Sequence, residues 1–387
     1  MDPFENPFSP GAGTPPPAFI GREDLITSYG VALRRTKSGR PGKSVMPIGL
    51  RGVGKTVLLN RFDQMAREEG LAAAFIEAPE TGDFKHLLAA RLRSILLELD
   101  RGSVSQAVKR ALGTLKSFSY ALPDGTSISL NVDAIAGSAD SGVLAEDTTD
   151  LLVATGEAAK DRGRGLLLAI DEVQYLTADE LAAVISAIHR TVQLGLPVIL
   201  VGAGLPQLPG LAGNAKSYAE RLFDFPEIGS LNDDDARAVL ATPAEAQEVE
   251  FTKDALDRLL SFTKGYPYFL QEWGYRVWNA APESPITLDD VTLAAPDVQR
   301  QLDENFFRVR MDRLTPSEKA YLGAMADLGP GPHRSGDIAA KLGVKVESVA
   351  PRRSGLIQKG MVYSPAHGDT AFTVPMFDEF LRRSQAS

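Results

Sequence analysis

The chain has 387 residues, of which 44% are hydrophobic and 24% charged, and its formal net charge is −9. This is the composition of a globular protein with room for two or three domains. The absence of cysteine excludes a disulfide framework and thiolate metal sites, and it suits a reducing compartment. No apolar run approaches the roughly 18–20 residues of a membrane span, and the first residues lack the features of a signal peptide. We therefore expect a cytoplasmic protein with no membrane partner.

The charge is distributed unevenly along the chain. From Leu314 to the C-terminus the sequence has 9 Lys and Arg and 7 Asp and Glu, a net charge of +2, which leaves −11 for the residues before it. The negative total argues against a protein that binds nucleic acid over its whole surface. The change of sign indicates a domain boundary near Leu314.

Short apolar strands alternate with helices over the first 229 residues. Residues 1–18 are rich in Pro and Gly and predict an extended arm. Residues 56–69 have helical spacing, and Gly70 ends that helix. Strands are predicted at residues 43–50, 71–78, 166–170, 197–201 and 223–228. Because fully apolar strands separated by helices are typical of a parallel sheet covered on both faces, we expect an α/β core over residues 19–229.

One segment interrupts this alternation. Residues 117–134 contain two runs of period 2 on either side of Pro123-Asp124-Gly125-Thr126. This pattern predicts a β-hairpin inserted between the second and third strands.

Two further regions follow the core. Residues 230–313 have a helical pattern throughout and predict a helical lid. In residues 314–387, Thr315 and Glu318 are spaced as a capping box at the start of a helix, and two short helices joined through Gly343 come next. The runs "MVYS" and "TAFTV" then flank the turn "PAHGD". This order of elements predicts a winged helix-turn-helix domain.

The stretch "GLRGVGKT", residues 49–56, fits the pattern G-x-x-x-x-G-K-[ST] without departure. Glycines allow backbone N–H groups to approach phosphate oxygens, and the helix that follows directs its positive dipole end at them. Lys55 is expected to neutralise the β- and γ-phosphates and Thr56 to bind Mg²⁺. The alternative, a chance glycine turn, does not explain the strand before it and the helix after it. The expected contacts with ATP or ADP are Gly49, Arg51, Gly52, Val53, Gly54, Lys55, Thr56 and Val57.

A second motif, "LLLAIDEVQYL", places Asp171 and Glu172 at the end of a buried strand. Two carboxylates in such a place are costly unless they serve a cation or a proton. An ATPase needs an acid near its Mg²⁺ and a group that orients or deprotonates the attacking water. Asp171 suits the first role and Glu172 the second. The alternative for the motif alone is an acidic N-cap after a strand.

These motifs resemble those of P-loop ATPases of the AAA+ and STAND type, in particular bacterial proteins similar to the origin-recognition and archaeal initiator ATPases. The resemblance covers about residues 19–384. It implies that Phe19, Ile20 and Gly21 of "FIGRED" lie by the adenine, and that Arg221 of "YAERLF" reaches the γ-phosphate. It also implies that Gly265 and Pro267 of "KGYPYFLQEW" belong to a nucleotide-binding lid. In "LVGAGLPQL" the usual polar sensor residue is missing.

Three of these residues have a structural alternative. Arg221 is equally consistent with a surface arginine whose stem covers Leu222. Gly265 and Pro267 equally suit a helix stop and the first-turn proline of the next helix.

The predicted second and third helices of the winged domain are basic. Residues 334–360 hold six Lys and Arg against two Asp and Glu. Such cations suit contacts with DNA phosphates and bases, and Lys345, Arg352 and Arg353 are the candidates. STAND proteins, in contrast, use a winged helix as an internal lid that makes no DNA contact.

The sequence thus predicts an α/β P-loop core with a helical lid and a C-terminal winged helix, acting as a slowly hydrolysing ATPase switch. Its partner is expected to be double-stranded DNA. The alternative is a signalling or scaffold switch that contacts a protein partner or further copies of itself.

Overall fold

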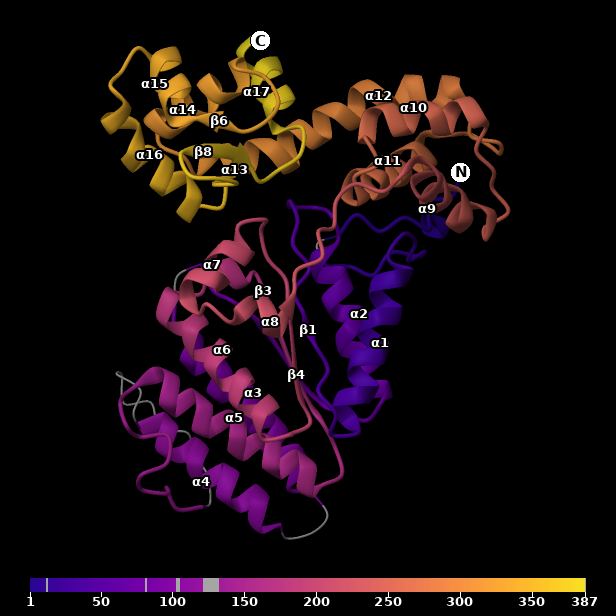
Figure 1. The fold of residues 1–387 in the computed structure, drawn as a ribbon. Helices are drawn as coiled ribbons and strands as arrows, with labels where there is room; N and C mark the ends of the chain where they lie inside the picture. Colours follow the sequence, from indigo (N-terminus) through magenta and orange to yellow (C-terminus); the bar gives the residue numbers. More distant parts are fainter. Residues whose placement is uncertain (12, 81, 102–104, 121–131, 387) are drawn as a thin grey trace. The chain divides into compact units, whose positions relative to one another are not determined.

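In this computed structural model the chain is described from residue 1 to 386 except for residues 12, 81, 102–104 and 121–131. Its packing separates two compact units (Figure 1). The α/β unit comprises residues 23–48 and 58–227. The helical unit comprises residues 1–22, 49–57 and 228–387. The glycine-rich loop therefore packs with the C-terminal half of the chain, although it lies early in the sequence.

A parallel five-stranded sheet forms the centre of the α/β unit, as predicted. Its strands are β1 (Ser44–Val45), β2 (Ala72–Glu77), β3 (Leu166–Asp171), β4 (Val198–Gly202) and β5 (Phe223–Asp224), in the spatial order β2-β3-β4-β1-β5. The two strands that pair at one edge, β1 and β5, are shorter than the apolar runs that predicted them, since Pro47 and Pro226 cannot donate to a ladder. Ile48 continues the pairing as isolated bridges to Gly204 and Glu227.

Helices cover both faces of this sheet. In Figure 1, α1 (Glu23–Lys37) and α2 (Lys55–Glu68) lie on one face, and α3 (Phe84–Leu99), α5 (Leu144–Asp161) and α6 (Ala178–Gln193) lie on the other. The helix α4 (Gln106–Tyr120) packs against α5. Two short helices, α7 (Leu208–Ala215) and α8 (Ala219–Leu222), follow β4. Strands β3 and β4 are buried along their whole length, as expected for strands covered on both sides.

The predicted hairpin is wrong where the structure describes it. Residues 117–120 belong to α4, and Ser117 and Phe118 are buried on the face of that helix. The alternation of polar and apolar residues that suggested a strand is overridden because these side chains pack against the neighbouring helices. Residues 121–131, with the predicted turn, lie outside the described residues.

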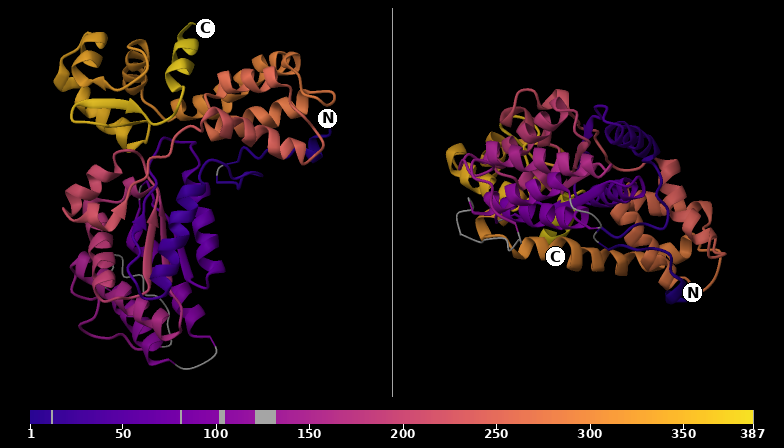
Figure 2. Two further views of the ribbon diagram at one scale, coloured as in Figure 1. Left: turned by 45° about the vertical axis from the view of Figure 1, so that its right-hand side comes forward. Right: turned by 90° about the horizontal axis from the view of Figure 1, so that it is seen from below.

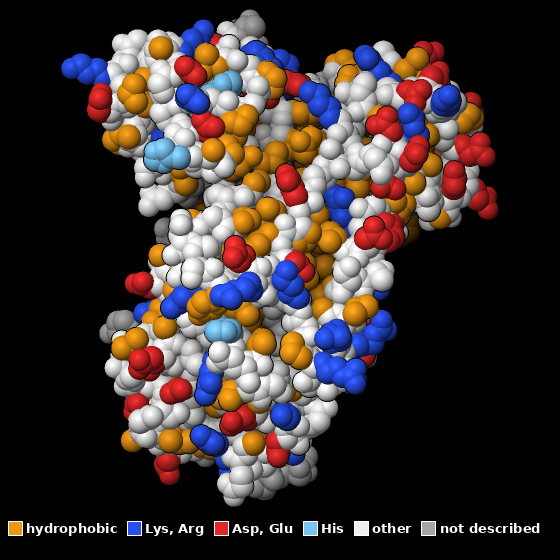
Figure 3. All heavy atoms as spheres, viewed as in Figure 1, with side chains coloured by type: hydrophobic (Ala, Val, Ile, Leu, Met, Phe, Trp, Pro, Cys, Tyr) orange, Lys and Arg blue, Asp and Glu red, His pale blue; other side chains and the backbone are white. Residues whose placement is uncertain are grey.

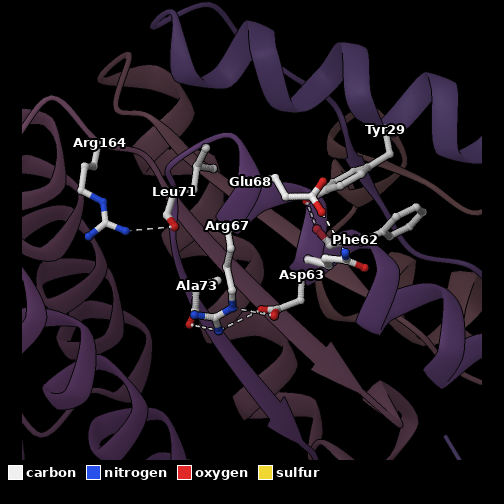
Figure 4. Close-up of polar contacts among 9 residues, drawn as sticks. Tyr29, Phe62, Asp63, Arg67, Glu68, Leu71, Ala73 and Arg164 are labelled. Carbon is white, nitrogen blue, oxygen red and sulfur yellow. Dashed lines mark hydrogen bonds and ion pairs between the residues drawn. The ribbon is translucent and has the colours of Figure 1, made fainter. Parts of the chain in front are cut away.

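The helix that follows the glycine-rich loop is anchored at its far end. Figure 4 shows the ring of Tyr29 in α1 stacked on Phe62 of α2, with ring centroids 4.2 Å apart, and the Tyr29 hydroxyl donates to the Phe62 carbonyl at 3.2 Å. Arg67 donates to Asp63 at 2.7 Å and to the Ala73 carbonyl of β2 at 3.0 Å. These contacts fix α2 against α1 and the sheet.

The residues predicted as a helical lid belong to the helical unit, and we call this stretch the lid region. They form α9 (Asp233–Glu245), α10 (Lys253–Thr263), α11 (Pro267–Ala280) and α12 (Leu288–Leu302). Figure 3 shows acidic side chains gathered over this region. The first turn of α9 contains Asp233, Asp234 and Asp235. A π-helix (Asp303–Arg308) and α13 (Val309–Asp312) continue α12 without a break, and Figure 2 shows them as one long rod. Such π-turns place side chains out of regular helical register.

The C-terminal segment has three helices and a small antiparallel sheet, followed by a last helix. Its elements are α14 (Pro316–Asp327), β6 (His333–Arg334), α15 (Ser335–Leu342), α16 (Val346–Gln358), β7 (Val362–Tyr363), β8 (Asp369–Phe372) and α17 (Phe377–Ala386). The strands lie in the order β6-β8-β7. The predicted capping box is present, because the Thr315 hydroxyl accepts from the Glu318 N–H at 3.3 Å while Glu318 accepts from the Thr315 N–H at 2.8 Å.

The first nine residues pack onto α11 of the lid. Phe8 is only 2% exposed and meets the ring of Trp278 edge to face, with centroids 6.4 Å apart. A Cβ at Gly274 would lie 2.7 Å from the Phe8 ring, so glycine makes the room for it. The Trp278 indole donates to the Asp2 carbonyl at 3.1 Å. Phe4, in contrast, is 95% exposed.

We expect Phe8→Ala to lower the free energy of unfolding by about 3 kcal/mol, the lower end of the range for replacing a buried Phe with Ala. Urea unfolding measured by tryptophan fluorescence checks this, because both tryptophans lie on α11. Phe4→Ala removes the same atoms from an exposed site and should change the free energy of unfolding by less than about 0.5 kcal/mol. Equal effects of the two variants would show that the arm does not pack on the lid.

Candidate active site

The glycine-rich loop has the conformation that its sequence requires. Residues 49–54 connect β1 to α2, and α2 begins at Lys55 as predicted. Gly52 has a φ of +83° and Gly54 a φ of +92°, which other residues adopt only with strain. A Cβ at Gly49 would lie 2.1 Å from the Ile228 carbonyl oxygen. A Cβ at Gly54 would meet nothing within 4 Å, so that side of the loop is open.

Lys55 lies inside the curve of the loop. Its side chain is only 6% exposed, and its Nζ donates to the carbonyl oxygens of Gly49 and Leu50, both at 2.9 Å. The first turn of α2 contains no acidic residue. A buried ammonium group at the positive end of a helix dipole makes a site for an anion, and the residues therefore fit a phosphate group. Thr56 is the next residue of the helix, where its hydroxyl could reach a cation bound to that phosphate.

The other predicted loop contacts have mixed environments. Val53 is 2% exposed, so its side chain belongs to the packing under the loop. The N–H of Arg51 donates to the Thr373 carbonyl at 2.8 Å, so this backbone group is occupied by the C-terminal segment. Gly52 offers its carbonyl to the N–H of Tyr268 at 3.1 Å. Val57 is the third residue of α2 and is half-buried.

Three residues that the sequence analysis missed form a stack beside the loop. The Tyr268 ring is stacked on Phe306 of the π-helix with centroids 4.5 Å apart, and the Arg310 guanidinium lies 4.0 Å from the Phe306 centroid. Burial raises the pKa of the Tyr268 hydroxyl to about 12. Burial, and then the nearby Arg51, lower the pKa of the Arg310 guanidinium. The lowered pKa of Arg310 thus reflects its burial and a second cation near it, beside the glycine-rich loop.

Gly265 and Pro267 have the roles of a helix stop and a first-turn proline. α10 ends at Thr263, Lys264 has a φ of +50° and Gly265 a φ of +71°. A Cβ at Gly265 would lie 2.5 Å from the Leu231 carbonyl oxygen, and the Leu231 N–H donates to the Gly265 carbonyl at 2.8 Å. Pro267 is the first residue of α11. Together they set the start of α11, whose second residue, Tyr268, contacts the loop at Gly52.

The segment containing Phe19, Ile20 and Gly21 lies before α1, by the start of α9. Gly21 has a φ of +78°, and a Cβ there would lie 2.8 Å from a carboxylate oxygen of Asp235 and 2.8 Å from a methyl group of Leu231. Ile20 packs against the apolar core of the helical unit. The structure thus brings this predicted base-pocket segment to the lid.

The acidic pair stands at the carboxyl end of β3. Asp171 is the last residue of the strand and is 3% exposed, and one of its oxygens accepts from the Glu172 N–H at 2.8 Å. Glu172 has a left-handed φ of +52°, an uncommon conformation for a residue with a side chain. Its carboxylate accepts a hydrogen bond from the amide of Gln174. Because β1 is parallel to β3 in this sheet, β1 reaches the same edge and runs on into the loop.

Arg221 is an exposed residue of the short helix α8 in the α/β unit, and its N–H donates to the Tyr218 carbonyl at 3.0 Å. Its role at the γ-phosphate stays a prediction.

The three basic candidates of the C-terminal segment differ in their surroundings. Arg353 donates from Nε to the Thr370 hydroxyl at 2.8 Å, and from one terminal nitrogen to the Ser364 hydroxyl at 2.6 Å and the Asp369 carbonyl at 2.9 Å. It therefore ties α16 to the β7–β8 pair. Lys345 is exposed at the N-cap of α16, and Arg352 is half-exposed on that helix.

Comparison with protein families gives two matches. Residues 18–201 match the family described as "AAA ATPase domain", and residues 304–381 match "Domain of unknown function (DUF8462)". The second match begins inside the π-helix, before the domain boundary predicted at residue 314. A comparison with curated proteins gives no significant match. Within the described ranges, no helix is long and apolar enough to span a membrane.

Solved structures with a similar fold include the Walker-type ATPase of Pyrococcus abyssi, with a TM-score of 0.57 and 14% identity over 94% of this chain and 96% of that chain. The Thermotoga maritima RuvB Holliday junction branch migration motor has a TM-score of 0.47 and 18% identity over 94% of this chain and 95% of that chain. The Aeropyrum pernix ORC1 protein in complex with DNA has a TM-score of 0.48 and 16% identity over 95% of this chain and 94% of that chain. Of these three structures, only the Pyrococcus abyssi ATPase has a TM-score above 0.5, and it alone supports the assignment of the fold. The parallel sheet with its covering helices is a P-loop ATPase fold. The family match of residues 18–201 agrees with this fold.

Proposed function

We propose that the protein binds ATP and hydrolyses it slowly to ADP and phosphate. The observation that carries this proposal is the buried Lys55 ammonium inside a glycine-rich loop, at the first residue of a helix. Lys55 and the backbone N–H groups at the start of α2 would hold the β- and γ-phosphates. Calorimetric titration of the whole chain with ATP and with ADP tests it directly.

The acidic pair supplies the rest of the chemistry in this proposal. Asp171 and the Thr56 hydroxyl would hold Mg²⁺, which neutralises charge on the phosphates when bound. Glu172 would accept a proton from the attacking water, a role that needs an ionised carboxylate held at the edge of the sheet. Arg221 would add a cation to the γ-phosphate in hydrolysis or in assembly with a neighbouring copy.

We further propose that the nucleotide controls how the lid and the C-terminal segment are held. Both regions contact the loop through its backbone, α11 at Gly52 and the C-terminal segment at Arg51. A phosphate beside the loop would also relieve the repulsion between Arg51 and Arg310. Binding of ATP or release of phosphate at the loop would therefore change its contacts with both regions, as a switch requires.

For the output of the switch, we propose contact with double-stranded DNA through the C-terminal segment, taken as a winged helix. The order of α14, β6, α15, α16, β7 and β8 supports this assignment. Lys345, the N-cap residue of α16, and Arg352, within that helix, would contact phosphates, whereas Arg353 is used within the segment. The other candidate, a protein partner or a second copy, is favoured by the overall negative charge.

We expect Lys345→Ala combined with Arg352→Ala to weaken binding of the whole chain to duplex DNA of any sequence. Each lost phosphate contact should reduce the slope of log affinity against log salt by about 1. Fluorescence anisotropy over a range of salt concentrations measures this. Lys253→Ala combined with Lys319→Ala removes the same charge from α10 and α14 and should leave the slope unchanged. No duplex binding by the wild-type chain at low salt, with or without ATP, would reject the DNA role.

A further inference from the structure

Gln174 uses both ends of its side-chain amide within the α/β unit. The amide nitrogen donates to a carboxylate oxygen of Glu172, two residues earlier in the chain. The amide oxygen accepts from the N–H of Leu205, in the segment that follows β4, at 3.0 Å. A single side chain therefore bridges the residue after β3 and the segment after β4.

The orientation of this amide is determined by its partners. A backbone N–H such as that of Leu205 can only donate, so it must face the amide oxygen of Gln174. The amide nitrogen is then directed at Glu172, whose carboxylate can accept. A Cβ at Gly204 would lie 2.9 Å from the Gln174 amide oxygen, so the glycine leaves room for this bond.

Main-chain hydrogen bonds hold the two segments that the Gln174 side chain bridges. The N–H of Val173 donates to the Ala203 carbonyl at 2.9 Å, and the N–H of Ala203 donates to the Ile170 carbonyl at 2.9 Å. Val173 and Ala203 are 1% and 0% exposed. The main chain beneath Gln174 is thus continuous with the hydrogen-bonded ladder between β3 and β4, and the Gln174 amide adds a bond to the side chain of Glu172.

We propose that Gln174 is the positioning residue of Glu172, and that it links the carboxylate to the segment 203–205 after β4. The proposal rests on the proposed function, in which Glu172 is the proton acceptor. The amide donates to one carboxylate oxygen of Glu172. It also carries no charge, so it orients the carboxylate without neutralising it. Gln174 thereby connects Glu172 to the segment that follows β4, which begins with Ala203 and Gly204.

Two variants of the whole chain separate positioning from folding. Gln174→Met keeps the length of the side chain and removes both hydrogen bonds, and we expect turnover to fall by about 10-fold to 100-fold. The affinity for ATP, measured by calorimetry, should stay within about twofold, since both hydrogen-bond partners of Gln174 belong to the α/β unit and not to the loop. Gln193→Met, at the exposed end of α6, is the matched control and should not change turnover.

Gln174→Glu gives a readout that a purely structural role would not change. Its side chain can still accept from Leu205, but it turns a second carboxylate toward Glu172. The second carboxylate cannot donate to Glu172, so turnover should fall as it does in Gln174→Met while the affinity for ATP stays within about twofold. A variant that had only lost folding stability would instead lose ATP affinity and turnover together.

A double-mutant cycle decides whether Gln174 acts through Glu172. In the background of Glu172→Gln, which removes the proton acceptor, Gln174→Met should cause no further loss of turnover. The inference is overturned if the two losses multiply, or if Gln174→Met alone leaves turnover unchanged. Failure of the proposed function has a different outcome, because the wild-type chain would then show no turnover, or Glu172→Gln would turn over at the wild-type rate.

Discussion

Lys55→Ala should show no measurable binding of ATP or ADP in a calorimetric titration, an affinity loss of at least about 100-fold. The variant removes the ammonium group that donates to the loop carbonyls of Gly49 and Leu50. Charge-assisted hydrogen bonds to phosphate are among the strongest polar contacts in proteins, and here they form at the positive end of a helix, where water is largely excluded. A loss of 100-fold corresponds to about 2.7 kcal/mol, which one such pair of bonds can supply.

The control for Lys55→Ala is Lys43→Ala, which removes an exposed lysine that pairs with Asp224 near β1. It should bind nucleotide like the wild-type chain. Thermal unfolding without nucleotide shows whether Lys55→Ala is folded, since this variant also loses two bonds to loop carbonyls. Unchanged affinity in a folded Lys55→Ala variant would remove the basis for placing phosphate at this loop.

Glu172→Gln should bind ATP like the wild-type chain and hydrolyse it at least about 100-fold more slowly. The change keeps the size and one hydrogen-bonding oxygen of the side chain but removes its ability to accept a proton, and general-base catalysis contributes about 10²-fold to 10⁴-fold. Glu172 is the residue after β3, so its main chain is held by the sheet and should not move in the variant. Phosphate release measured in steady state gives the ratio of rates.

Glu220→Gln, on the exposed surface of α8, changes the same functional group away from the sheet edge and should hydrolyse ATP normally. Wild-type turnover in Glu172→Gln would show that this carboxylate has only a structural role in the turn after β3. Weak binding in that variant would instead place Glu172 in the ATP contact itself.

The parallel sheet and the loop were predictable because short-range patterns determine them. Four or five fully apolar strands separated by helices have few alternatives to a parallel sheet, and the loop combines three glycines with a lysine that begins a helix. The capping box of Thr315 and Glu318 is equally local, and it formed as expected. The hairpin prediction failed for the opposite reason, since the burial of Ser117 and Phe118 in α4 depends on neighbours that are distant in the sequence.

The contacts around the loop were not predictable from the sequence. Tyr268, Phe306 and Arg310 come from α11, the π-helix and α13, and no spacing in the sequence relates them to residue 52. Only the aromatic pair at positions 306 and 307, next to two arginines, could have indicated a functional cluster. Similarly, the basic pair Arg352 and Arg353 gave no sign that Arg353 would turn inward to Thr370 and Ser364. The packing of the loop with the C-terminal half of the chain is a long-range property of the same kind.

The central claim is that this chain binds ATP at residues 49–56 and converts it to ADP with Glu172. One measurement tests both parts: a single-turnover assay in which excess protein is mixed with ATP and Mg²⁺, and the protein-bound nucleotide is recovered and identified over time. The account predicts that the wild-type chain retains nucleotide that changes from ATP to ADP, that Glu172→Gln retains ATP, and that Lys55→Ala retains neither. Recovery of unchanged ATP from the wild-type chain at all times, or equal retention by Lys55→Ala, would contradict it.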